Sequence, residues 1–120
     1  MRARLRSLRC AFAGLAYLVR TQPNARIHAV ASVVVIALGA LLRLGVHDWC
    51  WLVAAMTMVW SAEAINTALE CLADFVTSEQ CPLIGHAKDA GAASVLCAAA
   101  GASVIGLLVL GPPLWAALVK

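Results

Sequence analysis

Apolar residues recur at helical spacing near the start of the chain. They lie three or four residues apart, at Leu5, Leu8, Phe12, Leu15 and Val19. This period predicts an amphipathic helix over about residues 4–20. Another face of the same helix carries cationic residues, namely Arg2, Arg6, Arg9 and Arg20. One apolar face and one cationic face are typical of a helix in the headgroup layer of a membrane, so a surface helix is expected here.

Three later segments are apolar on all sides. They are predicted at about residues 27–44, 49–76 and 87–110. Each is long enough to cross a bilayer, because a hydrocarbon core of about 30 Å takes about 20 helical residues. Thr-Gln-Pro-Asn at 21–24 should break the chain before the first span. The turn at 45–48 is so short that the first two spans must run antiparallel.

The second and third spans have distinctive ends and faces. As a helix, residues 49–76 would be about 42 Å long, so the carboxyl end should project into water. A polar segment, 77–86, follows and contains the helix breaker Pro82, and Gly-Pro-Pro at 111–113 is expected to end the third span. Small residues at helical spacing on the third span predict close helix packing in lipid. They are Ala87, Gly91, Ser94, Ala98 and Gly101.

Composition indicates a membrane protein. Of the 120 residues, 63% are hydrophobic and 12% are charged, and the mean hydropathy is +0.90. Soluble domains are about 45–50% apolar and about 25% charged. The length supports a single domain over residues 1–120. The five cysteines lack metal-ligand spacing and are interpreted as small packing residues. We therefore predict an all-α integral membrane protein with three transmembrane helices and an N-terminal surface helix.

The distribution of charge predicts the orientation. Seven of the nine basic residues lie before Leu44, and the net charge is +3. Nucleic-acid binding is another interpretation of a basic N-terminus. It is rejected because these arginines flank membrane spans and no basic, aromatic surface follows them. Positive residues favour the cytoplasmic side, so the N-terminus and the segment between the second and third spans should both be cytoplasmic.

A stripe of polar residues lies on the second span. Glu63, Asn66, Glu70 and Asp74 are spaced three, four and four residues apart, which places them on one narrow face of a helix. An ionisable group inside a membrane segment costs about 2.5–3.5 kcal/mol on insertion scales and persists mostly where it has a function. The stripe therefore indicates a functional site at a membrane.

The depths of the two glutamates suggest different chemistry. Glu63 should lie about 10 Å deeper than Glu70. A carboxylate at lipid depth is desolvated, which suits it to accept a proton near neutrality. Glu70 at the interface, beside Lys88 and Asp89, suits a Mg²⁺–phosphate group. This arrangement favours transfer of a phosphoryl group from a water-soluble donor to a lipid hydroxyl.

Other interpretations of the stripe stay open on the residues alone. The chain has no Walker loop and no Gly-rich kinase loop, so a nucleotide site would have to be unorthodox. A small transporter or proton-coupled protein could use Glu63 instead. A structural polar cluster in a helix bundle is the third possibility.

The stripe also carries a family resemblance. The segment from Glu63 to Asp74, Glu-Ala-Ile-Asn-Thr-Ala-Leu-Glu-Cys-Leu-Ala-Asp, closely resembles the signature helix of the bacterial diacylglycerol kinase/undecaprenol kinase family. That signature reads Glu-x-aliphatic-Asn-Ser/Thr-Ala-aliphatic-Glu-x-x-x-Asp. The Ala-Lys-Asp segment at 87–89 and the segments 11–14 and 24–28 are similar to the same family, so the resemblance covers nearly the whole chain.

The resemblance implies an enzyme and its assembly. The chain would be a lipid kinase in the bacterial inner membrane, using ATP as donor and Mg²⁺ as cofactor. It would form a homotrimeric helical bundle with active sites shared between subunits at the cytoplasmic interface. Diacylglycerol and undecaprenol are about equally favoured as lipid substrates.

The resemblance also implies residue roles. Glu63 would be the general base and contact the lipid, and Glu70 would hold Mg²⁺-ATP. The remaining nucleotide-binding residues would be Asn66, Asp74, Lys88 and Asp89. Asn24 and Arg26 would contact the substrate.

Two positions depart from the family pattern. Many relatives carry a metal-assisting Glu where this chain has Gln22. An amide oxygen can ligate Mg²⁺ but brings no negative charge, so Gln22 is expected to hold the metal more weakly. Relatives often have a His at the position of Cys81. His86 is nearby but out of register, and it is interpreted as a solvated side chain.

Overall fold

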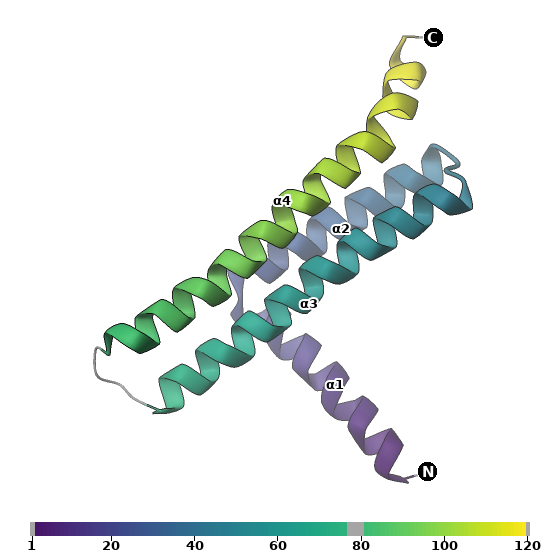
Figure 1. Cartoon of the computed structure of the whole chain (residues 1–120). Helices are drawn as coiled ribbons and strands as arrows, with labels where there is room; N and C mark the ends of the chain where they lie inside the picture. Colours follow the sequence, from purple (N-terminus) through teal and green to yellow (C-terminus); the bar gives the residue numbers. More distant parts are fainter. Residues whose placement is uncertain (1, 77–80, 120) are drawn as a thin grey trace.

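The computed structural model describes residues 2–76 and 81–119, and this part of the chain contains four α-helices and no strand (Figure 1). The helices are α1 (Arg2–Thr21), α2 (Pro23–Leu41), α3 (Val46–Val76) and α4 (Pro82–Leu118). The last three lie side by side in one bundle, and α1 projects away from it. All three bundle helices are long and apolar enough to cross a membrane. The predicted all-α membrane fold is confirmed.

A single residue separates α1 from α2. Gln22 is extended, with φ −100° and ψ 117°, and Pro23 occupies the first turn of α2. Proline disfavours a helical residue before it and needs no N–H donor at a helix start. The guanidinium of Arg26 reaches back to the end of α1, donating from Nε to the carbonyl of Val19 at 3.1 Å and from Nη2 to that of Arg20 at 2.6 Å. These bonds satisfy carbonyls that a helix end leaves free.

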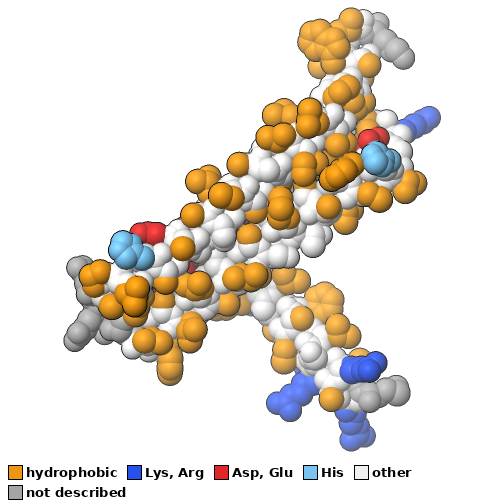
Figure 2. Space-filling view, in the orientation of Figure 1, with side chains coloured by type: hydrophobic (Ala, Val, Ile, Leu, Met, Phe, Trp, Pro, Cys, Tyr) orange, Lys and Arg blue, Asp and Glu red, His pale blue; other side chains and the backbone are white. Residues whose placement is uncertain are grey.

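Apolar side chains cover the outside of the bundle, and cationic side chains gather at the free end of α1 (Figure 2). Leu5, Leu8 and Phe12 of α1 are each more than half exposed. No protein element covers this apolar face among the described residues. An uncovered apolar face with arginines beside it is the arrangement expected for a helix that rests on a membrane surface.

Helix α3 packs most extensively against α4. Gly91 and Ala98 on α4 are buried, so the predicted close packing of small residues is right at these positions. Ala87 and Ser94 of the same predicted set are exposed in the single chain, and Gly101 is half-buried. Val95 is buried instead, because the face toward α3 follows the spacing 91, 95, 98 and Ser94 points away from it.

The helix ends differ from the predicted ones. Helix α2 spans 23–41 rather than 27–44, and the turn that follows it holds Arg43 in the left-handed region at φ 52°. Helix α3 begins at Val46, three residues early. Pro82 starts α4 and does not interrupt a loop, since the first helical turn tolerates proline. The other part of the predicted polar segment, 77–80, lies outside the described residues.

The predicted stop at Gly111-Pro112-Pro113 is wrong. Helix α4 continues through both prolines to Leu118. The two missing N–H groups leave the carbonyls of residues 108 and 109 without their usual donors. The helix nevertheless continues past these two positions and is capped only at Val119, whose N–H group donates to the carbonyl of Trp115.

Candidate functional site

The polar stripe of α3 is buried. Glu63, Asn66 and Thr67 are the buried polar or charged residues of the described chain, and Glu63 is only 2% exposed. They continue the face on which Leu52, Ala55 and Val59 are also buried. One buried face of α3 is therefore apolar in its first half and polar in its second half. A buried carboxylate is costly unless it has a partner, so its neighbours matter.

Glu63 lies beside a histidine from α2. Its Oε1 atom is 3.4 Å from Nε2 of His28, whose side chain is 18% exposed. The distance is within ion-pair range, but the angle is not that of a hydrogen bond, and Oε1 has no hydrogen-bond partner. The pair is therefore a close contact with one unsatisfied carboxylate oxygen.

Glu70 accepts hydrogen bonds from two amides, one at each oxygen. Nε2 of Gln22 donates to Oε2 at 3.3 Å, and Nδ2 of Asn66 donates to Oε1 at 3.0 Å. Gln22 reaches this point because the chain is extended before Pro23, and Asn66 lies one turn before Glu70 on the same helix face. The structure thus brings together three predicted site residues around a single carboxylate.

A glycine of α4 makes room for Asn66. A Cβ atom added at Gly91 would collide with Oδ1 of Asn66. That oxygen is buried and has no hydrogen-bond partner, and neither has the hydroxyl of Thr67. Buried polar atoms are usually paired, so each exception needs an explanation. Oδ1 of Asn66 therefore faces α4, while Nδ2 of the same amide faces Glu70.

The outer end of the stripe is exposed. Nζ of Lys88 donates to Oδ1 of Asp74 at 2.9 Å, with the two side chains 40% and 70% exposed. Asp89 and Asn24 are also exposed, and neither makes a side-chain hydrogen bond within the described ranges 2–76 and 81–119. Arg26 is exposed too, with its guanidinium at the end of α1. Among the described residues, Asn24, Arg26 and Asp89 therefore form no hydrogen bond or ion pair with the buried residues.

Sequence reasoning gave no site role to His28 or Gly91. His28 is an ionisable residue in an otherwise apolar segment of α2, and the rule that intramembrane ionisable groups are functional would have selected it. Gly91 was identified only as a packing residue. Its contact with Asn66 depends on the rotation of α4 against α3, which no sequence pattern specifies.

The oxygen atoms near Glu70 fit a magnesium ion that arrives with phosphates. Mg²⁺ prefers oxygen ligands and is usually held by one or two carboxylates together with substrate phosphates. Glu70 supplies one carboxylate, and Gln22 and Asn66, which bond to it, each carry an amide oxygen. Within the described part of the chain no three His, Cys, Asp or Glu side chains converge as a metal cage. The described residues of a single chain therefore do not form a tight site of protein ligands alone.

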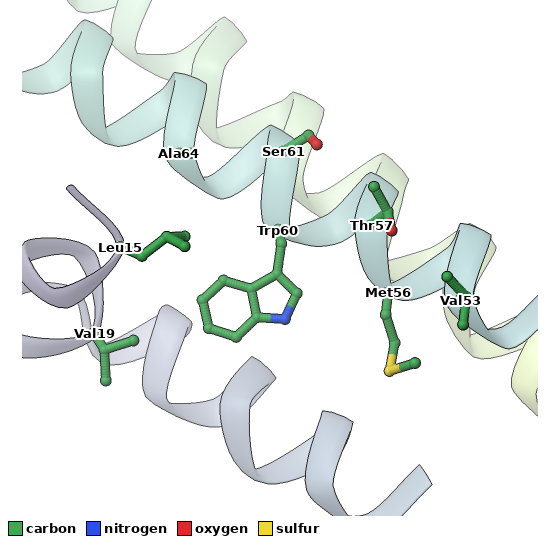
Figure 3. A pocket seen from close by; sticks show the side chains of 8 residues that line it. All are labelled: Leu15, Val19, Val53, Met56, Thr57, Trp60, Ser61 and Ala64. Carbon is green, nitrogen blue, oxygen red and sulfur yellow. The ribbon is translucent and has the colours of Figure 1, made fainter. Parts of the chain in front are cut away.

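Two apolar grooves run beside the site. One, of about 620 Å³, lies between α2, α3 and α4, and His28 and Ser32 are polar residues in its lining. The other, of about 530 Å³, lies between α1 and α3, and Trp60 projects from α3 into it (Figure 3). The first groove connects apolar surface to the side chain that contacts Glu63.

Known proteins resemble this chain over most of its length. Residues 9–110 match the family described as prokaryotic diacylglycerol kinase. The undecaprenol kinase of Bacillus subtilis is 36% identical over 95 residues, which are 79% of this chain and 77% of that protein. The diacylglycerol kinase of Synechocystis is 38% identical over 109 residues, which are 90% of this chain and 62% of that protein.

These similarities settle the class of protein. The matched region contains α2 and α3 with the whole buried stripe, and most of α4. The transporter interpretation finds no support among the relatives. This membrane protein belongs to the prokaryotic diacylglycerol kinase family and is a lipid kinase.

Proposed function

We propose that the protein transfers the γ-phosphate of Mg²⁺-ATP to the hydroxyl of a membrane lipid, diacylglycerol or undecaprenol. The observation that carries the proposal is the pair of glutamates on one face of α3. Glu63 is buried at membrane depth, and Glu70, two turns further along the same helix, is half-buried and surrounded by amides. The names of the two relatives support both lipids.

Glu63 is the general base of this reaction. Its carboxylate takes the proton of the lipid hydroxyl while the hydroxyl oxygen bonds to the γ-phosphorus, and the bond from that phosphorus to the leaving oxygen of ADP breaks. A base at lipid depth meets the hydroxyl where the lipid presents it. The closed surroundings of Glu63 keep competing water away from the reaction.

The nucleotide lies toward the outer end of the stripe. Glu70, with the amides of Gln22 and Asn66, holds the metal, which neutralises phosphate charge when it is bound. Turning the amide of Gln22 would present its oxygen in place of the nitrogen that now faces Glu70. Lys88 leaves Asp74 to contact phosphate oxygens.

Three more residues complete the predicted set. Asp89 follows Lys88 at the start of α4 and contacts the nucleotide, while Asn24 and Arg26 contact the lipid substrate near its polar end. All three side chains are exposed and so accessible to ligands.

The protein works in the bacterial cytoplasmic membrane with the site on the cytoplasmic side. The arginines of α1 support this orientation, because α1 joins the bundle at the end that holds Gln22 and Glu70. A homotrimer would cover the apolar surface and add ligands from a neighbouring chain to the sparse set around Glu70.

Transfer of labelled γ-phosphate from ATP to each lipid tests the activity. The purified protein is mixed in detergent micelles with diacylglycerol or undecaprenol, and the labelled lipid is separated and counted. Label should appear in at least one lipid and require Mg²⁺, and Glu63→Gln should remove it. Lipid-independent ATP hydrolysis without lipid labelling would contradict the proposal.

Subunit mixing tests the shared site. Glu63→Gln and Glu70→Ala chains, each expected to have low activity alone, are mixed under conditions where a fluorescence-transfer signal shows subunit exchange. If one site draws Glu63 and Glu70 from different chains, part of the activity returns. Absence of recovery at every mixing ratio would mean that one chain supplies both residues.

A further inference from the structure

A short chain of hydrogen bonds joins α3 to α2 beside Glu63. Nε1 of Trp60 on α3 donates to the hydroxyl of Ser32 on α2 at 3.1 Å. That hydroxyl donates in turn to the backbone carbonyl of His28 at 2.8 Å. Trp60 and Glu63 are three residues apart, on the same turn of α3. The hydrogen bonds therefore fix α2 against α3 at the level of the buried carboxylate.

His28 is the side chain that this arrangement brings to Glu63. In the described part of the chain, its imidazole is the only basic group within 4 Å of the Glu63 carboxylate, with 3.4 Å between Nε2 and Oε1. Oε1 has no hydrogen-bond partner, and the imidazole is mostly buried. A small rotation of the ring would give the Nε2–H group the angle that a hydrogen bond requires.

We infer that His28 is a positioning residue for Glu63. The inference rests on the proposed role of Glu63 as the base. An imidazole N–H directed at Oε1 fixes the carboxylate and leaves its second oxygen for the lipid hydroxyl. Misplacing a base by about 1 Å can cost about 100-fold in rate, so a residue that only orients Glu63 has a measurable effect.

The lipid groove gives His28 its place in the reaction. His28 and Ser32 line the groove between α2, α3 and α4, whose other walls are largely apolar. A lipid whose chain occupies that groove would meet the imidazole before it meets Glu63. The hydrogen bond from Ser32 reaches the backbone carbonyl of His28, so the bond from Trp60 to Ser32 holds this turn of α2, which carries the imidazole, against α3.

Variants of His28 test the inference in lipid-labelling kinetics. Leu fills the site without a donor, Asn is polar but too short to reach, and the longer Gln side chain can donate from Nε2. We expect His28→Leu and His28→Asn to lower kcat by about 10-fold or more while KM for ATP stays within about twofold. His28→Gln should restore kcat to within about threefold of the unchanged protein. His47→Leu, at the opposite end of α3, is the matched control and should keep kcat.

The outcomes separate this inference from the role of Glu63. Unchanged kcat in His28→Leu and His28→Asn overturns the positioning role, as does a loss that His28→Gln fails to repair. If His28→Leu does not assemble, His28→Asn compared with His28→Gln decides the question. Glu63→Gln tests the base separately. If this variant keeps its kinase activity, Glu63 is not the proposed base, whatever the His28 variants show. Adding His28→Leu to Glu63→Gln should cause no further loss if both act through one carboxylate.

Discussion

Two acid–base pairs lie at opposite ends of the same polar stripe and differ in every physical respect. Glu63 and His28 are 2% and 18% exposed and stand 3.4 Å apart without hydrogen-bond geometry. Asp74 and Lys88 are 70% and 40% exposed and form a hydrogen-bonded pair at 2.9 Å. The exposed pair is thus hydrogen-bonded, whereas the buried pair is not.

The difference indicates which pair is costly to the fold and therefore needs a functional explanation. Water compensates an exposed pair at every distance, so its members can adjust freely to one another and contribute little to folding. A buried carboxylate without a full set of hydrogen bonds destabilises the protein. This cost supports the proposal that Glu63 is kept for its chemistry. Glu70 lies between the extremes, half-buried and bonded at both oxygens.

The largest expected effect on kcat is at Glu63, in the buried pair. Glu63→Gln keeps the shape of the side chain and removes the base, so kcat for lipid phosphorylation should fall by about 10²–10⁴-fold. ATP binding and assembly should persist, since Glu63 is two turns from Glu70. The comparison is made by single-turnover labelling, with nucleotide binding and size-exclusion profiles recorded on the same samples.

Asp48→Asn is the matched control for that variant. Asp48 lies on the first turn of α3, at the far end of the helix from the stripe. Removal of this acid should leave kcat unchanged. Near-normal kcat in Glu63→Gln would contradict the functional role given to the buried Glu63–His28 pair.

Removing Glu70 should have the next largest effect. Glu70→Ala takes away the carboxylate placed for the metal and leaves the two amides of Gln22 and Asn66 without their acceptor. We expect KM for Mg²⁺-ATP to rise and kcat to fall, each by about tenfold or more. Titrations of Mg²⁺ at fixed ATP, and of ATP at saturating Mg²⁺, separate the two effects.

The converse change at Gln22 sharpens this result. Gln22→Glu adds a second negative charge next to Glu70, so half-saturation by Mg²⁺ should occur at a lower concentration. If neither Glu70→Ala nor Gln22→Glu alters the Mg²⁺ dependence, the metal lies elsewhere.

Much of this comparison was accessible from the sequence. The spacing of Glu63, Asn66, Glu70 and Asp74 placed them on one face, and the helix confirms it for the buried members. The relative depth of the two glutamates follows from helical rise alone. The three spans could be predicted because a helix in lipid must be long and apolar. This requirement produces long runs of apolar residues, which are easy to recognise in a sequence.

What the sequence did not predict depends on how helices meet. The contact of His28 with Glu63 joins residues 35 positions apart and requires a particular rotation of α2 against α3. The course of α4 through Pro112 and Pro113 differs from the prediction, because the prolines remove two backbone hydrogen bonds but the residues after them continue the helix to Leu118. A local sequence pattern predicts neither the rotation of one helix against another nor the continuation of a helix past two prolines.

A smaller effect is expected where α4 approaches the stripe. Gly91→Ala places a methyl group against Oδ1 of Asn66, so Asn66 must shift or the helices must separate. Overpacking of this kind typically costs about 1–3 kcal/mol. The midpoint of unfolding by sodium dodecyl sulfate should fall, and KM for ATP should rise as Asn66 moves away from Glu70.

Gly106→Ala provides the comparison for Gly91. It lies on the same helix, and an added Cβ would meet no atom within 4 Å. Its unfolding midpoint should stay level or rise, since alanine favours helix formation. Equal responses at the two glycines would show that the contact with Asn66 imposes no constraint on α4.

The smallest effect on stability is expected at the exposed pair. Asp74→Asn removes the negative charge of the pair at 2.9 Å and Lys88→Met removes its donor, yet both side chains lie largely in water. Neither variant should shift the unfolding midpoint measurably. The kinetics should distinguish them, because the proposed site uses the ammonium of Lys88 on the phosphates. Lys88→Met should raise KM for ATP more than Asp74→Asn, which leaves that cation present and unpaired. A clear loss of stability in both variants, with equal KM values for ATP, would mean that the pair stabilises the packing of α3 against α4. It would contradict the phosphate-binding role proposed for Lys88.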